Sequence, residues 1–546
     1  MAEAGASTQP QGGLPQEKPA PAPRSSPWAP FRSAPFRNMS LAQFVSNIGG
    51  WMQTVGAQEL MLTLTTSATF VALIQTAASL PVMLLAVPAG ALGDTVDRRR
   101  LLLVSQSFML LAAIVLAVLA LGGSLTPWLL LGLIFAVGVG QTFTSPTWQT
   151  LQPELVPAAD RPQAIALGSV NQNLSRAVGP AIGGALYAAT SAAALFFVNA
   201  VSFVPVIGVV ARWHPRARPQ REVAAEQAWE AIRAGARYVA ASPALRVILV
   251  RAGSFMLFAN SIWALLPLVA HSYLQLGSSG YGLLLGGVGV GAVAGAAALP
   301  RLRGRLAAGP LLTIATVVLA AMILALAFVR SVPLAALVVV VAGVAWILAL
   351  STLSSTYQAT LPGWVKARGM AYYLVVFQGG GALGSAAFGI LAERTTLQAA
   401  LVVASILLAV SGVLGLLLRF RSISPEELLP AGDWPEPHAW HGAHPVGPVL
   451  VTVEYHARQG RSEELVKALR TGRYARRRTG AVGWQVWRDA AEPDRILERF
   501  SVGSWDEHIR QGERVSRRDQ QRLEDIRALA DPERPAVVTH WVVATP

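Results

Sequence analysis

Helix-length apolar segments, separated by short polar stretches, fill the chain from Leu41 to Arg421. A helix needs about 20 mostly apolar residues to cross the hydrocarbon core of a bilayer. By this rule the pattern predicts an all-α membrane protein with twelve spans. They are residues 41–64, 68–92, 101–121, 127–147, 164–188, 192–212, 245–273, 281–301, 310–328, 333–354, 369–391 and 398–418. The first is rich in Gln, Thr and Gly, and it is retained because an even number places both ends of the array on one side.

The apolar array contains an internal repeat: it divides into two six-helix halves, and short motifs of the first half recur about 205 residues later in the second. Gly90, which precedes a basic run, corresponds to Gly295, which precedes another. Gly179-Pro180 likewise returns as Gly384-Ser385. Two multi-helix halves related by repetition are the architecture of secondary transporters, in which the substrate path lies between the halves.

The composition excludes an ordinary soluble protein, because 53% of the residues are hydrophobic, 14% are charged and the mean hydropathy is +0.46. The net charge of +14 does not indicate a nucleic acid partner, because the basic residues follow membrane topology. The loops of one face carry Arg98, Arg99, Arg100, Arg161, Arg301, Arg303, Arg305, Lys366 and Arg368, and those of the other carry Arg330 and Arg394. This positive-inside pattern predicts a bacterial inner-membrane protein with both termini in the cytoplasm.

Several kinds of chemistry find no support in the sequence. Cysteine is absent, which excludes disulfides and thiolate metal sites. His438, His441 and His444, on a segment rich in Pro and Gly, are a weak metal signature, and we expect neither a metal nor another cofactor. The chain lacks the Gly-x-x-x-x-Gly-Lys-Ser/Thr loop that binds ATP, so a gradient must drive transport.

The changes in composition divide the chain into six parts. They are a disordered cytoplasmic tail (1–35), a first six-helix half (36–212), a cytoplasmic amphipathic linker (213–243), a second six-helix half (244–421), a second linker (422–447) and a soluble domain (448–546). In the soluble domain the order β-α-β-β-α-β predicts an α+β, ferredoxin-like fold. Ser504 and Glu507 have the spacing of a capping box at the start of its second helix.

Two motifs carry a family resemblance. The first, after the second span, comprises Gly90, Asp94, Asp97, Arg98 and Arg100, and the second, in the fifth span, comprises Arg176, Gly179, Pro180, Gly183 and Gly184. Both resemble motifs of the major facilitator superfamily, specifically its drug:proton antiporter branch, which includes siderophore and macrolide exporters. Thr95 departs from the superfamily pattern. The resemblance covers about the first 420 residues.

The resemblance implies a role for each motif. Asp94, Arg98 and Arg100 would form a latch that joins the inner faces of the two halves, whereas ordinary membrane-flanking charge is the alternative reading of the arginines. In the second motif, small residues four apart allow close packing against a neighbouring helix, and the proline can bend the helix. The resemblance implies that this helix lies between the halves and helps to seal the cavity.

Polar side chains at mid-depth are the candidates for a substrate site. Counting inward at about 1.5 Å per residue places five halfway through the membrane, namely Gln141, Asn173, Arg176, Asn260 and Gln378. Asn173 and Gln378 are equivalent in the repeat, and the cost of a charge at this depth requires that Arg176 face a cavity or a partner. We expect Arg176, Asn173, Asn260 and Gln378 to line the substrate cavity. Hydrogen-bonded struts between helices are the alternative.

Proton coupling needs a group in the path that changes charge. Glu59 is the carboxylate that lies well inside an expected span, toward the outer end of the first. Desolvation there could allow it to exchange a proton for substrate, and the alternative is a solvated residue at the outer interface. His271, near the outer end of the seventh span, is a lesser candidate.

The soluble domain resembles the dimeric, ferredoxin-like domains of antibiotic-biosynthesis monooxygenases over about 95 residues. Its aromatic and imidazole residues include Trp484, Trp487, Trp505, Trp541, His456, His508 and His540, but it contains no Asn, which some of these relatives use in catalysis. The resemblance implies a homodimer through residues 448–546. An enzyme that modifies cargo and a module that binds or senses cargo remain alternatives.

The sequence therefore predicts a transporter and not an enzyme. The expected function is the proton-coupled export of amphipathic small molecules, of the drug, macrolide or siderophore type, by alternating access. Its expected partners are the small-molecule substrate, protons and the lipid bilayer, and the outward direction rests on the resemblance.

Overall fold

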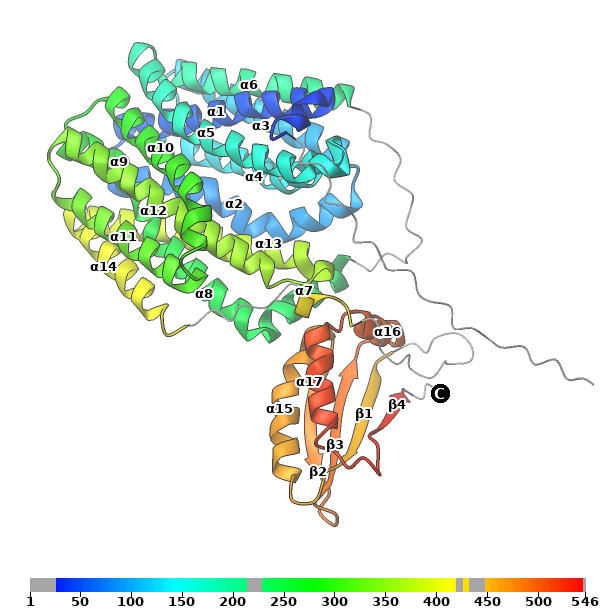
Figure 1. Cartoon of the computed structure of the whole chain (residues 1–546). Helices are drawn as coiled ribbons and strands as arrows, with labels where there is room; N and C mark the ends of the chain where they lie inside the picture. The colour runs from blue at the N-terminus through cyan, green and yellow to red at the C-terminus, as the bar shows by residue number, and fades with distance from the viewer. Residues whose placement is uncertain (1–25, 214–227, 419–425, 432–446, 544–546) are drawn as a thin grey trace, which may run out of the picture.

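The computed structural model describes residues 26–213, 228–418, 426–431 and 447–543. A bundle of long helices forms the main body, and a small domain of helices and strands lies beside one end of it (Figure 1). Most of the expected 1–35 tail, part of the 213–243 linker and most of the 422–447 linker, with its three histidines, lie outside the described residues.

The first half of the bundle contains α1 (Ala34–Leu64), α2 (Ala68–Thr95), α3 (Arg98–Leu121), α4 (Pro127–Leu151), α5 (Arg161–Ala189) and α6 (Ala192–Arg212), with the short turns η1 (Ala29–Arg32), η2 (Gln152–Leu155) and η3 (Ala158–Asp160). The side chains of Ser67, Asp97 and Thr126 each accept a hydrogen bond from the backbone N–H three residues later. These caps satisfy N–H groups that a helix start leaves unpaired, which fixes where α2, α3 and α4 begin.

The second half contains α8 (Pro243–Ala259), α9 (Ser261–Leu268), the π-helical segment η4 (Val269–Tyr273), α10 (Ser278–Arg303), α11 (Ala308–Phe328), α12 (Val332–Ala359), η5 (Gly363–Val365), α13 (Lys366–Arg394) and α14 (Leu397–Leu414). The expected span 245–273 is therefore interrupted twice, at Asn260 and at η4. Interrupted helices of this kind are common where a transporter builds its substrate site.

Within the described residues, ten helical segments are long and apolar enough to cross a membrane. The other two long helices, α1 and α5, have the length of a span but a more polar composition, including Gln58 and Glu59 in α1 and Asn171 and Arg176 in α5. The twelve predicted spans are thus supported by hydropathy at ten positions, and the spans formed by α1 and α5 stay predictions.

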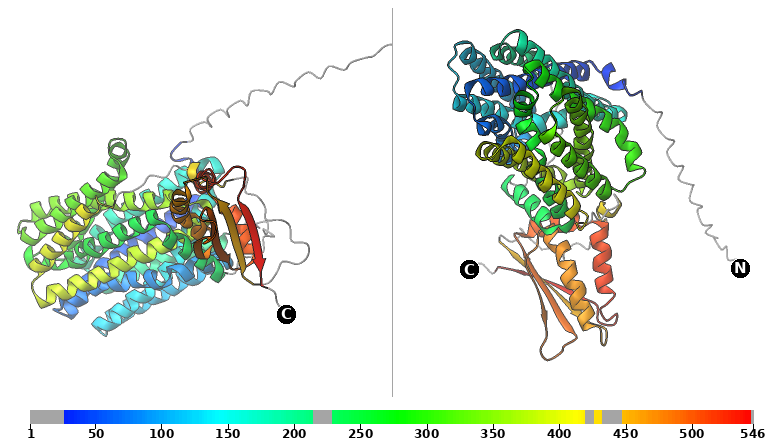
Figure 2. Two further views of the ribbon diagram at one scale, coloured as in Figure 1. Left: turned by 90° about the horizontal axis from the view of Figure 1, so that it is seen from below. Right: turned by 90° about the vertical axis from the view of Figure 1, so that its left-hand side faces the viewer.

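The two halves lie side by side, with α1, α2 and α5 of the first half against α9, α10 and α13 of the second (Figure 1, Figure 2). We call the end of the bundle beside the small domain the proximal end, and the opposite one the distal end. Helices α1 and α13 end at the distal end, where α2 and α14 begin (Figure 1).

The small domain contains β1 (Val449–His456), α15 (Ser462–Thr479), β2 (Val482–Arg488), β3 (Arg495–Val502), α16 (Trp505–Glu513), α17 (Arg517–Arg527) and β4 (Val537–Val542). Its strands form one antiparallel sheet in the order β2-β3-β1-β4, with α15 and α17 on one face (Figure 1, Figure 2). Tyr455, Leu465, Ile496 and Leu523 are buried between the sheet and these helices. The elements follow the expected order, except that two helices, α16 and α17, occupy the place of the second.

The capping box predicted at the start of α16 is present. The side chain of Ser504 accepts a hydrogen bond from the N–H of Glu507, and the Glu507 carboxylate accepts one from the N–H of Gly503, both at 3.2 Å. Glu507 also forms an ion pair with Arg237 of α7 (Ala228–Ala241), the helix that connects the two halves. The same carboxylate thus caps the start of α16 and fastens the small domain to α7.

Helix α7 lies between the bundle and the small domain (Figure 1). The Tyr238 ring makes an edge contact with Trp364 of η5, with ring centres 5.4 Å apart, and Arg514 of the small domain lies 5.0 Å from the Trp364 ring centre. Burial raises the pKa of the Tyr238 phenol to about 12. The sequence predicted a cytoplasmic amphipathic linker over 213–243, and in the structure Ala234, Tyr238 and Val239 of α7 are buried against protein.

Candidate transport path between the two halves

A carboxylate and an imidazole join the two halves near the distal end. The Glu59 carboxylate of α1 lies 3.0 and 3.1 Å from Nε2 of His271 in η4. Glu59 is 4% exposed, and its only described ion pair is with His271. The two residues that the sequence singled out separately for proton coupling are therefore a single pair, in which a proton can pass between carboxylate and imidazole.

The neighbouring residue, Gln58, also crosses between the halves. Its side-chain N–H donates to the backbone carbonyl of Trp263 on α9 at 3.2 Å, and its carbonyl oxygen accepts from the Tyr281 hydroxyl of α10. Gln58 and Trp263 are 205 residues apart, which is the period of the sequence repeat. Equivalent residues that touch one another must lie beside the pseudo-two-fold axis, so this contact marks the axis that relates the halves.

Close helix packing brings the glycines of the fifth-span motif against the second half. A Cβ atom at Gly184 would lie 2.5 Å from the Ser278 carbonyl oxygen and 2.9 Å from Cα of Gly282, both in α10. Within the first half, Gly179 and Gly183 face α1 just as closely. The motif thus packs α5 against α1 and α10 at once, as small-residue faces allow.

Helices α2 and α13 form a further contact between the halves at the distal end. The Glu393 carboxylate accepts hydrogen bonds from the Ser67 hydroxyl at 2.6 Å and the Thr69 N–H at 3.0 Å, and the Thr76 hydroxyl donates to the Ala382 carbonyl at 2.9 Å. At the proximal end of α2, by contrast, a Cβ at Gly90 would meet no atom within 4 Å. The described hydrogen bonds between the helices of the two halves gather toward the distal end, which is closed.

Arg176 lies in a frame of tryptophans between the halves. Its guanidinium carbon is 5.4 Å from the ring centre of Trp51 on α1 and 5.9 Å from that of Trp263 on α9. Trp263 in turn contacts Trp346 of α12, with ring centres 5.3 Å apart. We call Arg176, Trp51, Trp263 and Trp346 the arginine–tryptophan cluster; its cation lies over the negative faces of two indole rings.

The other expected cavity residues are not joined to Arg176 by any described contact. Asn260 donates to the Gly381 carbonyl at 3.0 Å and to the Ser385 hydroxyl, so it ties α8 to α13 inside the second half. Asn173 donates to a carbonyl within α5, and Gln141 donates to Ser145 within α4. Gln378 is partly buried. Asn260 therefore has the geometry of a hydrogen-bonded strut between helices, which is the alternative role that the sequence left open.

The motif after α2 makes its described contacts within the first half. Asp97 caps α3 by accepting from the N–H of Arg100, and Arg98 forms an ion pair with Glu154 of η2 at 3.0 Å. The Arg100 side chain is exposed, and the side chain of Asp94 lies outside the described residues. With the distal end closed, Arg98 is bound to Glu154 of the same half. The expected latch between the two halves stays a prediction.

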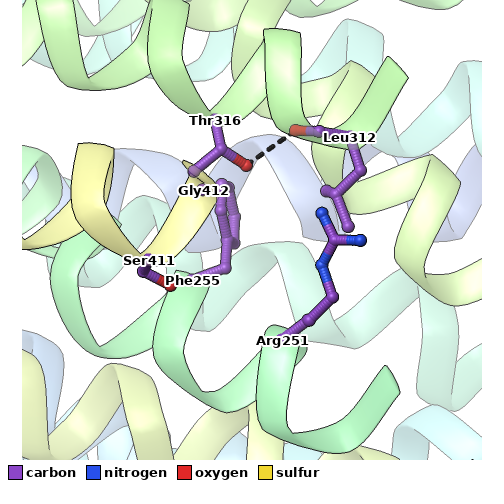
Figure 3. Close-up of a pocket in the computed structure, with 6 residues that line it drawn as sticks. All are labelled: Arg251, Phe255, Leu312, Thr316, Ser411 and Gly412. Carbon is purple, nitrogen blue, oxygen red and sulfur yellow. Dashed lines mark hydrogen bonds between the residues drawn. The ribbon is translucent and has the colours of Figure 1, made fainter. Parts of the chain in front are cut away.

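A second buried arginine is bound inside the second half. Arg251 of α8 donates to the Thr313 hydroxyl at 3.1 Å, and that hydroxyl donates to the Gly412 carbonyl at 3.2 Å. Figure 3 shows Arg251 beside Phe255, Thr316 and Ser411 around a cavity of about 10 Å³. That is about the space of one water molecule, so this site stabilises the second half and has no room for cargo.

The small domain contains a histidine pair among the aromatic residues that the sequence analysis noted. Nε2 of His508 on α16 lies 2.8 Å from Nε2 of His540 on β4, and both rings contact Trp505 edge-on. Burial and the neighbouring His540 lower the pKa of His508 to about 4. No group of three or more metal-ligating side chains occurs in the described part of the chain. His508 is therefore neutral at neutral pH, and its contact with His540 links α16 to β4.

Sequence reasoning missed Trp51, Trp263 and Tyr281. Aromatic residues in apolar helices look alike in a sequence, and nothing in the local pattern separates one that faces the other half from one that faces lipid. The repeat makes Trp263 the equivalent of Gln58, but only the structure shows that the two residues touch.

Comparisons with known proteins agree with this architecture. A family model described as transmembrane secretion effector matches residues 25–546. A Staphyloferrin A transporter of Staphylococcus aureus is 28% identical over 164 residues, which are 30% of this chain and 41% of that protein. YfiS of Bacillus subtilis, an uncharacterized MFS-type transporter, is 28% identical over 163 residues, which are 30% of this chain and 38% of YfiS. The matched part spans less than half the length of either relative.

Solved transporter structures share the fold of the helical bundle. The nucleoside transporter NupG has a TM-score of 0.58 at 14% identity, covering 70% of this chain and 99% of NupG. A bacterial homologue of the human lysosomal transporter Spinster, in an inward-facing conformation, has a TM-score of 0.57 at 15% identity, covering 71% of this chain and 97% of that chain. At these identities the likeness shows the fold alone. Because the family model matches nearly the whole chain, the protein belongs to the transmembrane secretion effector family and is a membrane transporter of the major facilitator superfamily type.

Proposed function

We propose that the protein exports amphipathic small molecules from the cytoplasm in exchange for protons, by alternating access of its two halves. The observation that carries the proposal is the Glu59–His271 pair, a titratable pair buried between α1 and η4. Any movement that opens the distal end must pull these two side chains apart. Proton binding and distal opening are therefore linked through one contact.

The charge of the pair decides which arrangement is favoured. With one proton between them, Glu59 and His271 are neutral overall, either as carboxylic acid and imidazole or as an ion pair. Without that proton the pair carries a net negative charge, which is costly to bury between apolar helices. A proton that binds from the distal side therefore favours distal closure, and its loss toward the proximal side favours reopening. Cargo moving the other way completes the exchange.

The direction follows from the expected topology. Arg98, Arg99, Arg303 and Lys366 belong to the proximal ends of their helices or to the turns beside them. By the positive-inside rule the proximal end faces the cytoplasm. The small domain then lies in the cytoplasm, and the distal end, where the described hydrogen bonds between the halves gather, faces outward.

Drugs, macrolides and siderophores are the proposed cargo classes. The bundle presents mostly apolar residues with few polar anchors, which suits amphipathic molecules better than sugars. The similarity to a Staphyloferrin A transporter supports a small-molecule cargo.

Accumulation of drugs, dyes and siderophores in efflux-deficient bacteria tests the proposal. Cells that express the chain should accumulate less of at least one compound, and a protonophore should abolish the difference. A difference that survives the protonophore would contradict proton coupling, and greater accumulation in expressing cells would contradict export.

We further propose that the small domain, with its ferredoxin-like order of strands, joins two copies of the transporter. The sheet face opposite α15 and α17 carries exposed apolar side chains, among them Trp487 on β2 and Trp541 on β4, which are 52% and 59% exposed. Leu450 on β1 is paired with Trp541, and Thr452, Glu454 and Arg499 share this face. Exposed tryptophans among polar residues are typical of protein-contact surfaces.

Replacing one tryptophan of this face with a charge tests the assembly. Trp541→Lys should convert a dimer of the full chain into monomers, because a central interface tryptophan commonly contributes about 2 kcal/mol or more to association. The masses of the detergent-solubilised protein, measured by light scattering, would show the change. Trp28→Lys is the control, because Trp28 is 65% exposed but lies outside the sheet. A monomeric wild type, or a Trp541→Lys protein that remains dimeric, would contradict the assembly.

A further inference from the structure

The arginine–tryptophan cluster is rich in hydrogen-bond donors that have no acceptor. Nε of Arg176 and Nε1 of Trp263 and Trp346 are buried, and none of the three donates a hydrogen bond to another described group. The three side chains form a chain of contacts: Arg176 lies against Trp263, and Trp263 lies against Trp346. Buried donors are nearly always paired in folded proteins, so three in one cluster call for an explanation.

No carboxylate among the described residues forms an ion pair with this arginine, and Glu59 is bonded to His271. Arg251, the buried arginine of the second half, has the Thr313 hydroxyl as an acceptor. Arg176 is therefore a membrane-depth cation supported by aromatic faces alone, and its side chain stays partly exposed. Such a group pairs with a negative charge from outside the chain at a site built to receive it.

The position of the cluster makes it part of the transport path. Arg176 and Trp51 come from the first half, and Trp263 and Trp346 come from the second, so a ligand bound here contacts both. Gln58, about two turns beyond Trp51 on α1 and next to Glu59, donates to the Trp263 backbone. A movement of Trp263 would therefore also move Gln58, the residue that precedes Glu59 of the proposed proton site.

We infer that the cargo carries an anionic group, a carboxylate, that binds the guanidinium of Arg176 while its apolar or aromatic part packs on the tryptophans. This inference rests on the proposed function and names the substrate class of that path. Two carboxylate oxygens match the parallel N–H groups of a guanidinium. Indole rings supply flat apolar walls for the rest of the molecule. A neutral cargo would leave the Arg176 charge without a partner.

The test compares two probes of one shape, 1-naphthoate and 1-naphthamide, on the full-length protein in lipid nanodiscs. Calorimetric titration should give at least about tenfold tighter binding of the carboxylate than of the neutral amide. Arg176→Gln should reduce this preference to about twofold or less, and Arg176→Lys should leave an intermediate preference because it keeps the charge but loses the paired geometry. Arg330→Gln is the matched control, because Arg330 also stacks on an aromatic ring, 3.7 Å from the centre of Tyr273, outside the cluster.

The outcomes separate the inference from the proposed function. Equal binding of both probes to the wild type, no measurable naphthoate binding, or a preference that survives Arg176→Gln would overturn the inference. The two probes are compared on the wild-type protein. A variant that fails to fold therefore cannot explain away equal binding of the two probes. Gradient-driven export without a preference for carboxylates would refute the inference alone. A clear Arg176-dependent preference without any gradient-driven flux would refute the proposed function and leave the binding site standing.

Discussion

Glu59→Gln is expected to abolish gradient-driven transport while cargo still exchanges across the membrane. The amide of Gln keeps the size of the side chain and can still accept from His271, but it cannot bind or release a proton. Distal closure then no longer depends on pH. In proteoliposomes with an imposed pH gradient, net cargo movement should fall at least about tenfold, which corresponds to about 1.4 kcal/mol of lost coupling. Exchange of labelled for unlabelled cargo without a gradient should continue.

Glu393→Gln is the matched control for this experiment. Glu393 also joins the two halves at the distal end, but its partners are the Ser67 hydroxyl and the Thr69 N–H, which an amide oxygen can accept equally well. Its coupled transport should stay within about twofold of wild type, as for other mild surface changes. If Glu59→Gln kept full gradient-driven transport, or if Glu393→Gln lost as much, Glu59 would not be the coupling carboxylate.

Gly184→Val is expected to stop transport by forcing the distal end apart. Its Cβ would lie 2.5 Å from the Ser278 carbonyl oxygen and 2.9 Å from Cα of Gly282, and both obstacles are backbone of α10. Neither can move aside as a side chain would, so α5 and α10 must separate. Overpacking of this kind costs about 1–3 kcal/mol, and it acts only on the closed arrangement. We expect at least about a tenfold loss of cargo flux.

A cysteine placed in the distal contact reports the separation, because the chain has no cysteine of its own. Ala72 on α2 is fully buried where Gly389 of α13 packs against it. A thiol reagent added from the distal side should label Ala72→Cys slowly in the parent and faster when Gly184→Val is present. Gly132→Val is the control, because a Cβ at Gly132 meets no atom within 4 Å. Unchanged labelling and flux in Gly184→Val would mean that distal closure does not depend on α5 and α10.

Much of the fold could be predicted from the sequence because hydropathy and capping act locally. Helices occupy each expected span, although the span 245–273 is divided into α8, α9 and η4. Helices α2, α3 and α4 begin where Ser67, Asp97 and Thr126 supply caps. In the small domain, the Ser504 capping box was likewise visible in the sequence. The burial of α7 could not be foreseen, because an amphipathic helix covers lipid or protein with the same pattern.

The candidate site was predictable only where chemistry made a residue rare. Glu59 and Arg176 stood out because charges within membrane spans are costly. That Glu59 meets His271, and that Trp51 and Trp263 enclose Arg176, depends on how distant helices pack. Asn260 shows a second limit of the sequence, which left open whether a polar residue at mid-depth serves in a strut or in a cavity wall; its hydrogen bonds join α8 to α13.

Proton movement through the purified protein tests whether Glu59 couples cargo transport to protons. The full chain would be placed in proteoliposomes that contain the pH-sensitive dye pyranine, and cargo would be added to one side without an imposed gradient. We expect cargo moving in one direction to drive protons in the other, and we expect Glu59→Gln to remove the dye signal but leave cargo exchange. Cargo flux with no proton movement, or with protons moving alongside the cargo, would contradict this expectation.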